Sequence, residues 1–119
     1  MYFFDTYALV ELTKNNASYD PFASFPLITT ALNVGEYYEF LIRTFGPNPA
    51  KNHLHSLTFR IIDITPQLAE KAVLLRRIHR KKKFSWADSI GYCAAKEHEL
   101  IFLTGDKEFK HLDNVRHIK

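Results

Sequence analysis

Short, continuous apolar runs alternate along the chain with longer segments whose apolar positions recur every three or four residues. The short runs predict strands over residues 2–4, 27–30, 59–64, 100–103 and 115–118. The longer segments predict helices over residues 6–14, 31–45, 67–82 and 84–97, with a short helical turn at 107–112. Strands that alternate with helices predict an α/β fold, in which helices cover both faces of a mostly parallel sheet.

Boundary residues support several of these elements. Thr6 is predicted to be the N-cap of the helix that follows it, Ser85 to start the helix over 84–97, and Thr65 to cap the helix over 67–82. Two segments stay open: 17–26 can hide a short helix, and 51–57 is ambiguous. Inward positions of the 67–82 helix are predicted to be Leu68, Ala72, Leu75 and Ile78.

Length and composition narrow the class of protein. At 119 residues the chain can bury one core, so we expect a single domain over 1–119. Apolar residues make up 46% of it, and no apolar run approaches the ~20 residues of a membrane span. The N-terminus lacks the features of an export signal, so we expect a cytoplasmic protein. The single cysteine, Cys93, is expected to be a small buried side chain.

Positive charge is concentrated in one segment, although the formal net charge is only +3. Six cations fall within eight positions: Arg76, Arg77, Arg80, Lys81, Lys82 and Lys83. Such a run can neutralise several phosphates of a nucleic acid. It can equally be the solvated end of a helix, where cations are favoured by the helix dipole.

Four acids stand at the ends of predicted strands or in the predicted first turns of helices: Asp5 and Asp106 follow strands, and Glu36 and Asp88 lie in first turns. Ligands of parallel α/β sheets bind beyond the carboxyl ends of the strands, so these acids can converge in one cleft. A buried carboxylate needs a counter-charge. Oxygen-only clusters favour hard divalent cations such as Mg²⁺ or Mn²⁺.

Each acid also has a simpler structural interpretation. Asp88 lies three residues after Ser85, the spacing of a capping box, and Asp106 can be a turn residue. Glu36 can be a surface acid on its helix. Asp5 is the hardest to explain in this way, because apolar residues precede and follow it.

Four sequence blocks that carry these acids resemble, in order and spacing, those of the PIN domain family, and most of all its VapC-type toxins. The blocks are Tyr2-Phe3-Phe4-Asp5-Thr6, Thr29-Thr30…Asn33-Val34-Gly35-Glu36, Phe84-Ser85-Trp86-Ala87-Asp88, and Phe102 to Phe109. The resemblance implies a three-layer α/β/α fold around a short, mostly parallel sheet. It also implies a Mg²⁺- or Mn²⁺-dependent endoribonuclease that cleaves single-stranded RNA through metal-activated water.

The same resemblance assigns roles and partners. Asp5, Glu36, Asp88 and Asp106 become the metal-site acids, and Thr104 becomes a neighbour that hydrogen-bonds within the site. An inhibitory antitoxin protein and a homodimer are implied as well. Beside such a cleft, the basic run at 76–83 is interpreted as an RNA-facing patch.

Alternative functions remain open on the sequence alone. The chain can be an RNA-processing PIN nuclease outside a toxin–antitoxin pair, or a non-catalytic module that binds RNA or protein. A receiver-like phosphoacceptor domain also has an acidic rim, but its acids lie closer together in the sequence.

Other chemistry-bearing residues have weaker patterns. His53 and His55 lie in a loop-like segment without carboxylate partners, so a metal site there is not expected. Glu11 and Asp63 can lie near the site or face solvent, and Lys107 can contact a phosphate or belong to the surface. Trp86 and Tyr92 are predicted to lie in the core, although an exposed Trp86 could stack on RNA.

Overall fold

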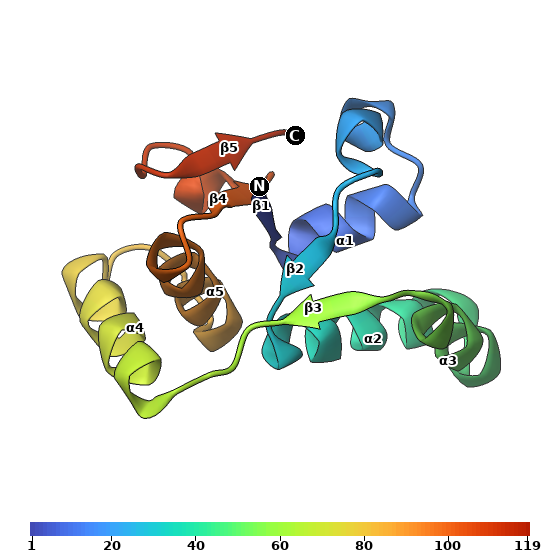
Figure 1. The fold of residues 1–119 in the computed structure, drawn as a ribbon, viewed down its shortest axis with the longest axis horizontal. Coiled ribbons are helices and arrows are strands. Elements are labelled where there is room, and N and C mark those ends of the chain that lie inside the picture. Colours follow the sequence, from blue (N-terminus) through green and yellow to red (C-terminus); the bar gives the residue numbers. More distant parts are fainter.

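A computed structural model describes all residues, 1–119, and contains one five-stranded sheet (Figure 1). Its strands are β1 (Tyr2–Phe4), β2 (Leu27–Thr29), β3 (Phe59–Ile61), β4 (Ile101–Thr104) and β5 (Val115–His117). They lie in the order β3-β2-β1-β4-β5, and every neighbouring pair is parallel. The predicted α/β fold with a parallel central sheet is therefore confirmed.

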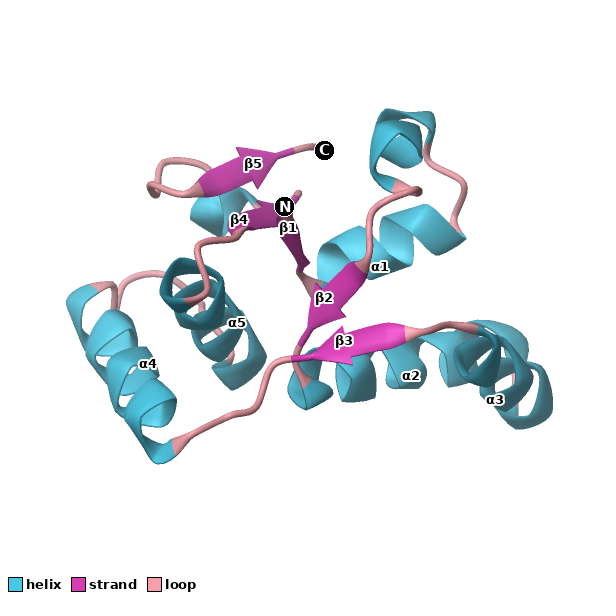
Figure 2. Ribbon diagram, in the orientation of Figure 1, coloured by secondary structure: helices cyan, strands magenta, loops and turns pink.

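Helices pack on both sides of the sheet (Figure 2). They are α1 (Thr6–Thr13), α2 (Ala31–Phe45), α3 (Pro47–Ser56), α4 (Pro66–Ile78) and α5 (Trp86–Glu97), with 3₁₀ turns η1 (Ala17–Phe22) and η2 (Lys107–Phe109). The two open segments are now assigned, since η1 lies within 17–26 and α3 covers most of 51–57. None of these helices combines the length and apolarity that a membrane crossing requires.

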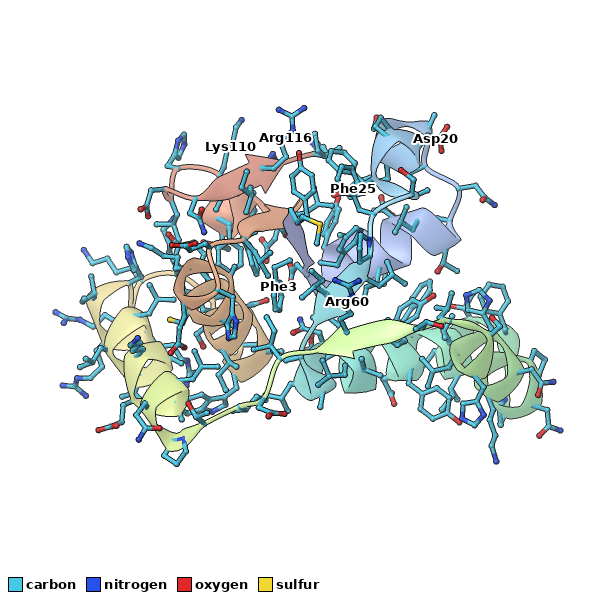
Figure 3. The ribbon with its side chains drawn as sticks, viewed as in Figure 1. Phe3, Asp20, Phe25, Arg60, Lys110 and Arg116 are labelled. Carbon is cyan, nitrogen blue, oxygen red and sulfur yellow. The ribbon has the colours of Figure 1, made fainter.

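Side chains that alternate along the strands build two separate cores. Phe3, labelled at the centre of Figure 3, packs with Phe102 and α5, whereas its neighbour Phe4 packs with Leu103 and residues of α1 and α2. Successive residues of a strand point to opposite faces, so one dipeptide contributes to both cores. Three layers result: α4 and α5 on one face, the sheet, and α1 to α3 on the other.

The two edge strands are short and charged. Arg60 is the middle residue of β3, and Arg116 is the middle residue of β5; both side chains are exposed (Figure 3). Short edge strands with charged residues resist pairing with other chains. The sheet therefore ends at both sides without a long apolar edge.

Several local predictions were wrong. Asp5, not Thr6, is the N-cap residue of α1. Ile78 is 76% exposed because α4 ends there, and Trp86, the first residue of α5, is 48% exposed although the next residue, Ala87, is buried. Tyr92, by contrast, is buried as predicted, and its hydroxyl donates to the Asp113 carbonyl (2.7 Å).

Candidate active site

The sheet brings two of the predicted acids together at its carboxyl edge. Asp5 directly follows β1 and Asp106 comes two residues after β4, and β1 and β4 are neighbours in register, with Phe4 opposite Leu103. The Asp5 amide donates to the Leu103 carbonyl (3.1 Å), which extends this pairing to the site. Parallel pairing therefore places acids 101 residues apart at adjacent strand ends.

Asp5 is the most buried acid, with 2% of its surface exposed. Its Oδ2 accepts a hydrogen bond from the Thr104 hydroxyl (2.7 Å), whereas Oδ1 is buried without any hydrogen-bond partner. Burial raises the pKa of Asp5 to about 7, and the charges of Asp88 and Glu36 contribute to the increase. A buried carboxylate oxygen without a donor is costly, so it requires an explanation in terms of function.

Asp88 combines a capping role with a place near Asp5. It lies in the first turn of α5, where its Oδ2 accepts from the Ser85 amide (2.8 Å) and Ser85 Oγ accepts from the Asp88 amide (3.0 Å). Burial raises the pKa of Asp88, and the charges of Asp106 and Glu36 raise it further. The capping interpretation is thus correct, but it uses only one carboxylate oxygen.

Asp106 is also a cap, at the start of η2. Its Oδ1 accepts from the Glu108 amide (3.0 Å), and its own amide donates to Thr104 Oγ1 (3.1 Å). Thr104 therefore links the two strand-end acids, because the same hydroxyl also donates to Asp5. This agrees with the hydrogen-bonding role that the sequence resemblance assigns to Thr104.

Glu36 is held by a network of side-chain hydrogen bonds that the sequence did not predict. Its Oε1 accepts from Thr6 Oγ1 (2.7 Å), Thr6 accepts from Asn33 Nδ2 (3.1 Å), and Asn33 Oδ1 accepts from Thr30 Oγ1 (2.7 Å). Asn33 and Thr30 are fully buried. Glu36 belongs to the second turn of α2, not to the first as predicted. The sequence did contain a signal for this network: the polar residues Thr30 and Asn33 stand at the start of α2, where they are buried.

The four acids border two adjoining hollows. Asp5, Asp88 and Asp106 line one of about 290 Å³, and Glu36 lines its neighbour; Thr6 contributes to both. Glu11 and Lys14 also line the first hollow, where they form an ion pair (3.7 Å). Glu11 is thus beside the site.

The donor chemistry of the four acids fits a hard divalent cation. Each acid has one oxygen that accepts a protein hydrogen bond and one that accepts none. A set of free carboxylate oxygens, one of them buried, is the chemistry that Mg²⁺ or Mn²⁺ requires. As the side chains stand, no three acidic, histidine or cysteine residues are arranged to hold one ion. That all four ligate one metal therefore remains a prediction.

Gly105 provides the close packing that the site requires. It lies between Thr104 and Asp106, and a Cβ atom there would overlap the Tyr7 ring and the Ile118 carbonyl oxygen. Only glycine allows the chain to pass this point with Tyr7 against it. The backbone between the two site residues is thereby fixed.

The basic run lines a pocket that shares no residue with the acidic hollows. The run occupies the end of α4 and the following segment, and four of its residues line this pocket with Trp86 and Phe84: Arg76, Arg77, Arg80 and Lys82. Of the remaining candidates, Asp63 and Lys107 are exposed. His53 lies in helix α3, not in a loop, and its Nε2 is 3.1 Å from the Tyr37 hydroxyl.

Comparison with known proteins decides the family. The model of the PIN domain matches residues 2–115, which is nearly the whole chain and includes every acid of the site. The chain belongs to the PIN domain family. The fold expected from the sequence blocks is thereby confirmed.

Solved structures give the same PIN fold. A toxin–antitoxin complex from Klebsiella pneumoniae contains a similar chain, with a TM-score of 0.75 and 22% identity over 99% of this chain and 100% of that one. The sarcin-ricin loop cleaving toxin VapC20 of Mycobacterium tuberculosis is similar as well, with a TM-score of 0.81 and 19% identity over 100% and 99% of the two chains. Among curated proteins, none matches this chain.

Proposed function

We propose that this PIN domain is a Mg²⁺- or Mn²⁺-dependent endoribonuclease that cleaves single-stranded RNA. The observation that carries the proposal is Asp5, a buried carboxylate whose Oδ1 has no protein donor while other acids lie near it. An ionised carboxylate is costly to bury without a counter-charge, and a bound cation would supply one. The similarity to VapC20, a sarcin-ricin loop cleaving toxin, supports RNA as the substrate.

Asp5, Glu36, Asp88 and Asp106 would hold the cation with the oxygens that accept no protein hydrogen bond. When bound, the cation supplies a hydrolytic nucleophile near neutral pH and compensates the charge that develops on the phosphate. The Thr104 hydroxyl holds Asp5 Oδ2 and so keeps Oδ1 directed to the site. Thr6 holds Glu36 in the same way, from the first residue of α1.

We also propose that the chain is the toxin of a toxin–antitoxin pair, inhibited by an antitoxin protein. The resemblance to one chain of a toxin–antitoxin complex and to a VapC toxin, over nearly the full length of each, supports this role. Its expression without the partner should then arrest growth, and Asp5→Asn should relieve the arrest. The homodimer and the cytoplasmic location stay predictions.

Cleavage of a single-stranded RNA by the purified protein tests the proposed activity. We expect cleavage with Mn²⁺, none with chelator, and a loss of at least about a hundredfold in Asp5→Asn. Asp63→Asn is the matched control, because Asp63 is an exposed aspartate that lines neither acidic hollow. Cleavage that persists with chelator, or that is unchanged in Asp5→Asn, would refute the proposal.

A further inference from the structure

The pocket beside α4 combines an exposed aromatic ring with unpaired cations. It has a volume of about 500 Å³, and its wall includes Trp86, Phe84, Arg76, Arg77, Arg80 and Lys82. A volume of this size lies within the range of small-molecule sites in proteins. In Figure 3, several side chains that end in nitrogen atoms (blue) surround the C-terminal end of α4.

Trp86 is held in place yet remains open to solvent. The Arg76 guanidinium carbon lies 4.4 Å from the centroid of the indole, and Arg76 Nε donates to the Phe84 carbonyl (3.3 Å). The guanidinium therefore covers one face of the ring while 48% of Trp86 stays exposed. An exposed tryptophan beside a fixed arginine is a ready surface for stacking another planar group.

The cations of the run have no acidic partners. Every ion pair of the structure lies elsewhere, between Lys14, Arg43, Lys71 or Lys96 and their acids. No acid occurs between Glu70 and Asp88, so six positive charges stand together in a chain whose net charge is +3. The electrostatic field of these cations attracts a polyanion, and a bound polyanion would neutralise the charges that no acid of the protein neutralises.

We propose that this pocket binds one unpaired base of a single-stranded RNA on Trp86, while the surrounding cations hold the adjacent phosphates. The proposal deepens the proposed function, on which it rests for its choice of RNA. In this proposal Trp86 stacks on the base, and Arg77, Arg80 and Lys82 contact the phosphates of the RNA backbone. An aromatic platform within a basic groove is how proteins bind single strands.

The position of the pocket suits a substrate that also reaches the acids. Trp86 and Asp88 belong to the same first turn of α5, about 3 Å apart along the helix axis. Residues two apart point to different sides of a helix, so the indole faces the α4 pocket and the carboxylate faces the acidic hollow. A strand that crosses the start of α5 can therefore contact both.

A single-stranded RNA fits better than an acidic peptide. Carboxylates of a peptide would satisfy the cations, but they would leave the exposed indole without a planar partner. RNA carries a base for each phosphate and so satisfies both features of the pocket at once.

Trp86 is the only tryptophan of the chain, so its fluorescence reports directly on the pocket. We would titrate Asp5→Asn protein, in chelator, with a short single-stranded RNA and with an oligonucleotide of equal length that lacks bases. We expect the RNA to quench the tryptophan and to bind at least about tenfold more tightly than the abasic oligonucleotide. Equal quenching and equal affinity would overturn the proposal.

Variants separate the base contact from the phosphate contacts, with binding followed by the anisotropy of a labelled RNA. Trp86→Ala should weaken binding about tenfold with the salt dependence unchanged, and Trp86→Phe should retain most of the affinity. Arg80→Ala should lower the slope of log affinity against log salt by about 0.7. Phe45→Ala is the matched control, because Phe45 is 51% exposed and lies at the far end of α2.

Three outcomes oppose the proposal: no effect of Trp86→Ala, an equal effect of Phe45→Ala, or an acidic peptide that displaces the RNA from Trp86 at lower concentration. Thermal melts of each variant exclude loss of folding as the cause. These measurements use chelator and Asp5→Asn protein, so they do not depend on cleavage. RNA that stacks on Trp86 without ever being cut by the wild type would refute the nuclease and leave the pocket intact.

Discussion

Among single residues, Asp5 is the most informative, because its surroundings disfavour the ionised form of its carboxyl group. Burial raises its pKa most, and the charges of Asp88 and Glu36 raise it further, whereas the Thr104 hydroxyl and the Thr6 amide act against them. A carboxylate with a pKa of about 7 takes up a proton under conditions in which an unfolded chain has released it. The stability of the cation-free protein must therefore depend on pH.

The sign of this dependence follows from the two pKa values of Asp5, 3.8 for the ordinary group and about 7 when folded. The raised value contributes stability that is fully present below pH 4 and is lost as the pH rises to 7 and above. With chelator, the unfolding free energy of Asp5→Asn minus that of the wild type should increase from pH 4 to 8, by up to about 4 kcal/mol. Urea unfolding at several pH values measures it, and a constant difference would contradict the pKa of Asp5.

Thr104 should matter through its hydroxyl. It is fully buried, donates to Asp5 and accepts from the Asp106 amide, so Thr104→Val leaves both groups without their partner. We expect this variant to lose about 2 kcal/mol of unfolding free energy at pH 8 and to lose most RNA cleavage. Thr104→Ser keeps the hydroxyl and should restore most of both quantities. Similar behaviour of the two variants would mean that the threonine acts only by packing.

At the scale of elements, the hydrophobic pattern was sufficient for most of the fold. All five strands and the helices α1, α2, α4 and α5 lie where the apolar spacing predicts them, with ends shifted by a few residues. The helix α3 was missed because Pro47 and Pro49 suggest a stop, whereas they occupy its first turn, where no amide donor is needed. Ile78 and Trp86 were placed in the core because spacing alone does not tell where a helix extends past its neighbours.

The site was predictable only in part, for a physical reason. The apolar neighbours of Asp5 are enough to predict a buried acid there. Asp88 and Asp106, by contrast, each cap a helix, so the local sequence around either one predicts only a cap. The support of Glu36 by Thr6 and Asn33 joins two helices that are distant in sequence. Hydrogen bonds of this kind depend on packing, which a single sequence does not encode locally.

Two glycines should respond oppositely to the same substitution. A Cβ at Gly35, within α2, would contact nothing, so Gly35→Ala should raise the unfolding free energy by about 0.5–1 kcal/mol through helix propensity. A Cβ at Gly105 would overlap Tyr7 and the Ile118 carbonyl, so Gly105→Ala should lower it by about 1–3 kcal/mol. Denaturant melts of both variants measure the pair. A neutral Gly105→Ala would show that the strand end beside Asp106 can shift freely.

At the scale of the whole molecule, the topology is what creates the acidic edge. Placing β1 between β2 and β4 brings Asp5 beside Asp106 and directs α2 and α5 so that Glu36 and Asp88 approach from the two helical layers. The unpaired cations at the end of α4 and after it line a different pocket, which shares no residue with the acidic hollows. The proposed cation site and the proposed RNA surface therefore adjoin at the first turn of α5, which carries both Asp88 and Trp86.

Binding of Mn²⁺ by calorimetry, to the wild type and to one variant of each acid, tests most directly whether the four acids form one site. We expect Asp5→Asn, Glu36→Gln, Asp88→Asn and Asp106→Asn each to weaken Mn²⁺ binding by at least about tenfold, and Asp63→Asn to leave it unchanged. Wild-type affinity should also rise with pH through 7, as Asp5 loses its proton. Wild-type Mn²⁺ binding in Asp5→Asn, or the same loss in Asp63→Asn, would contradict a single site formed by the four acids.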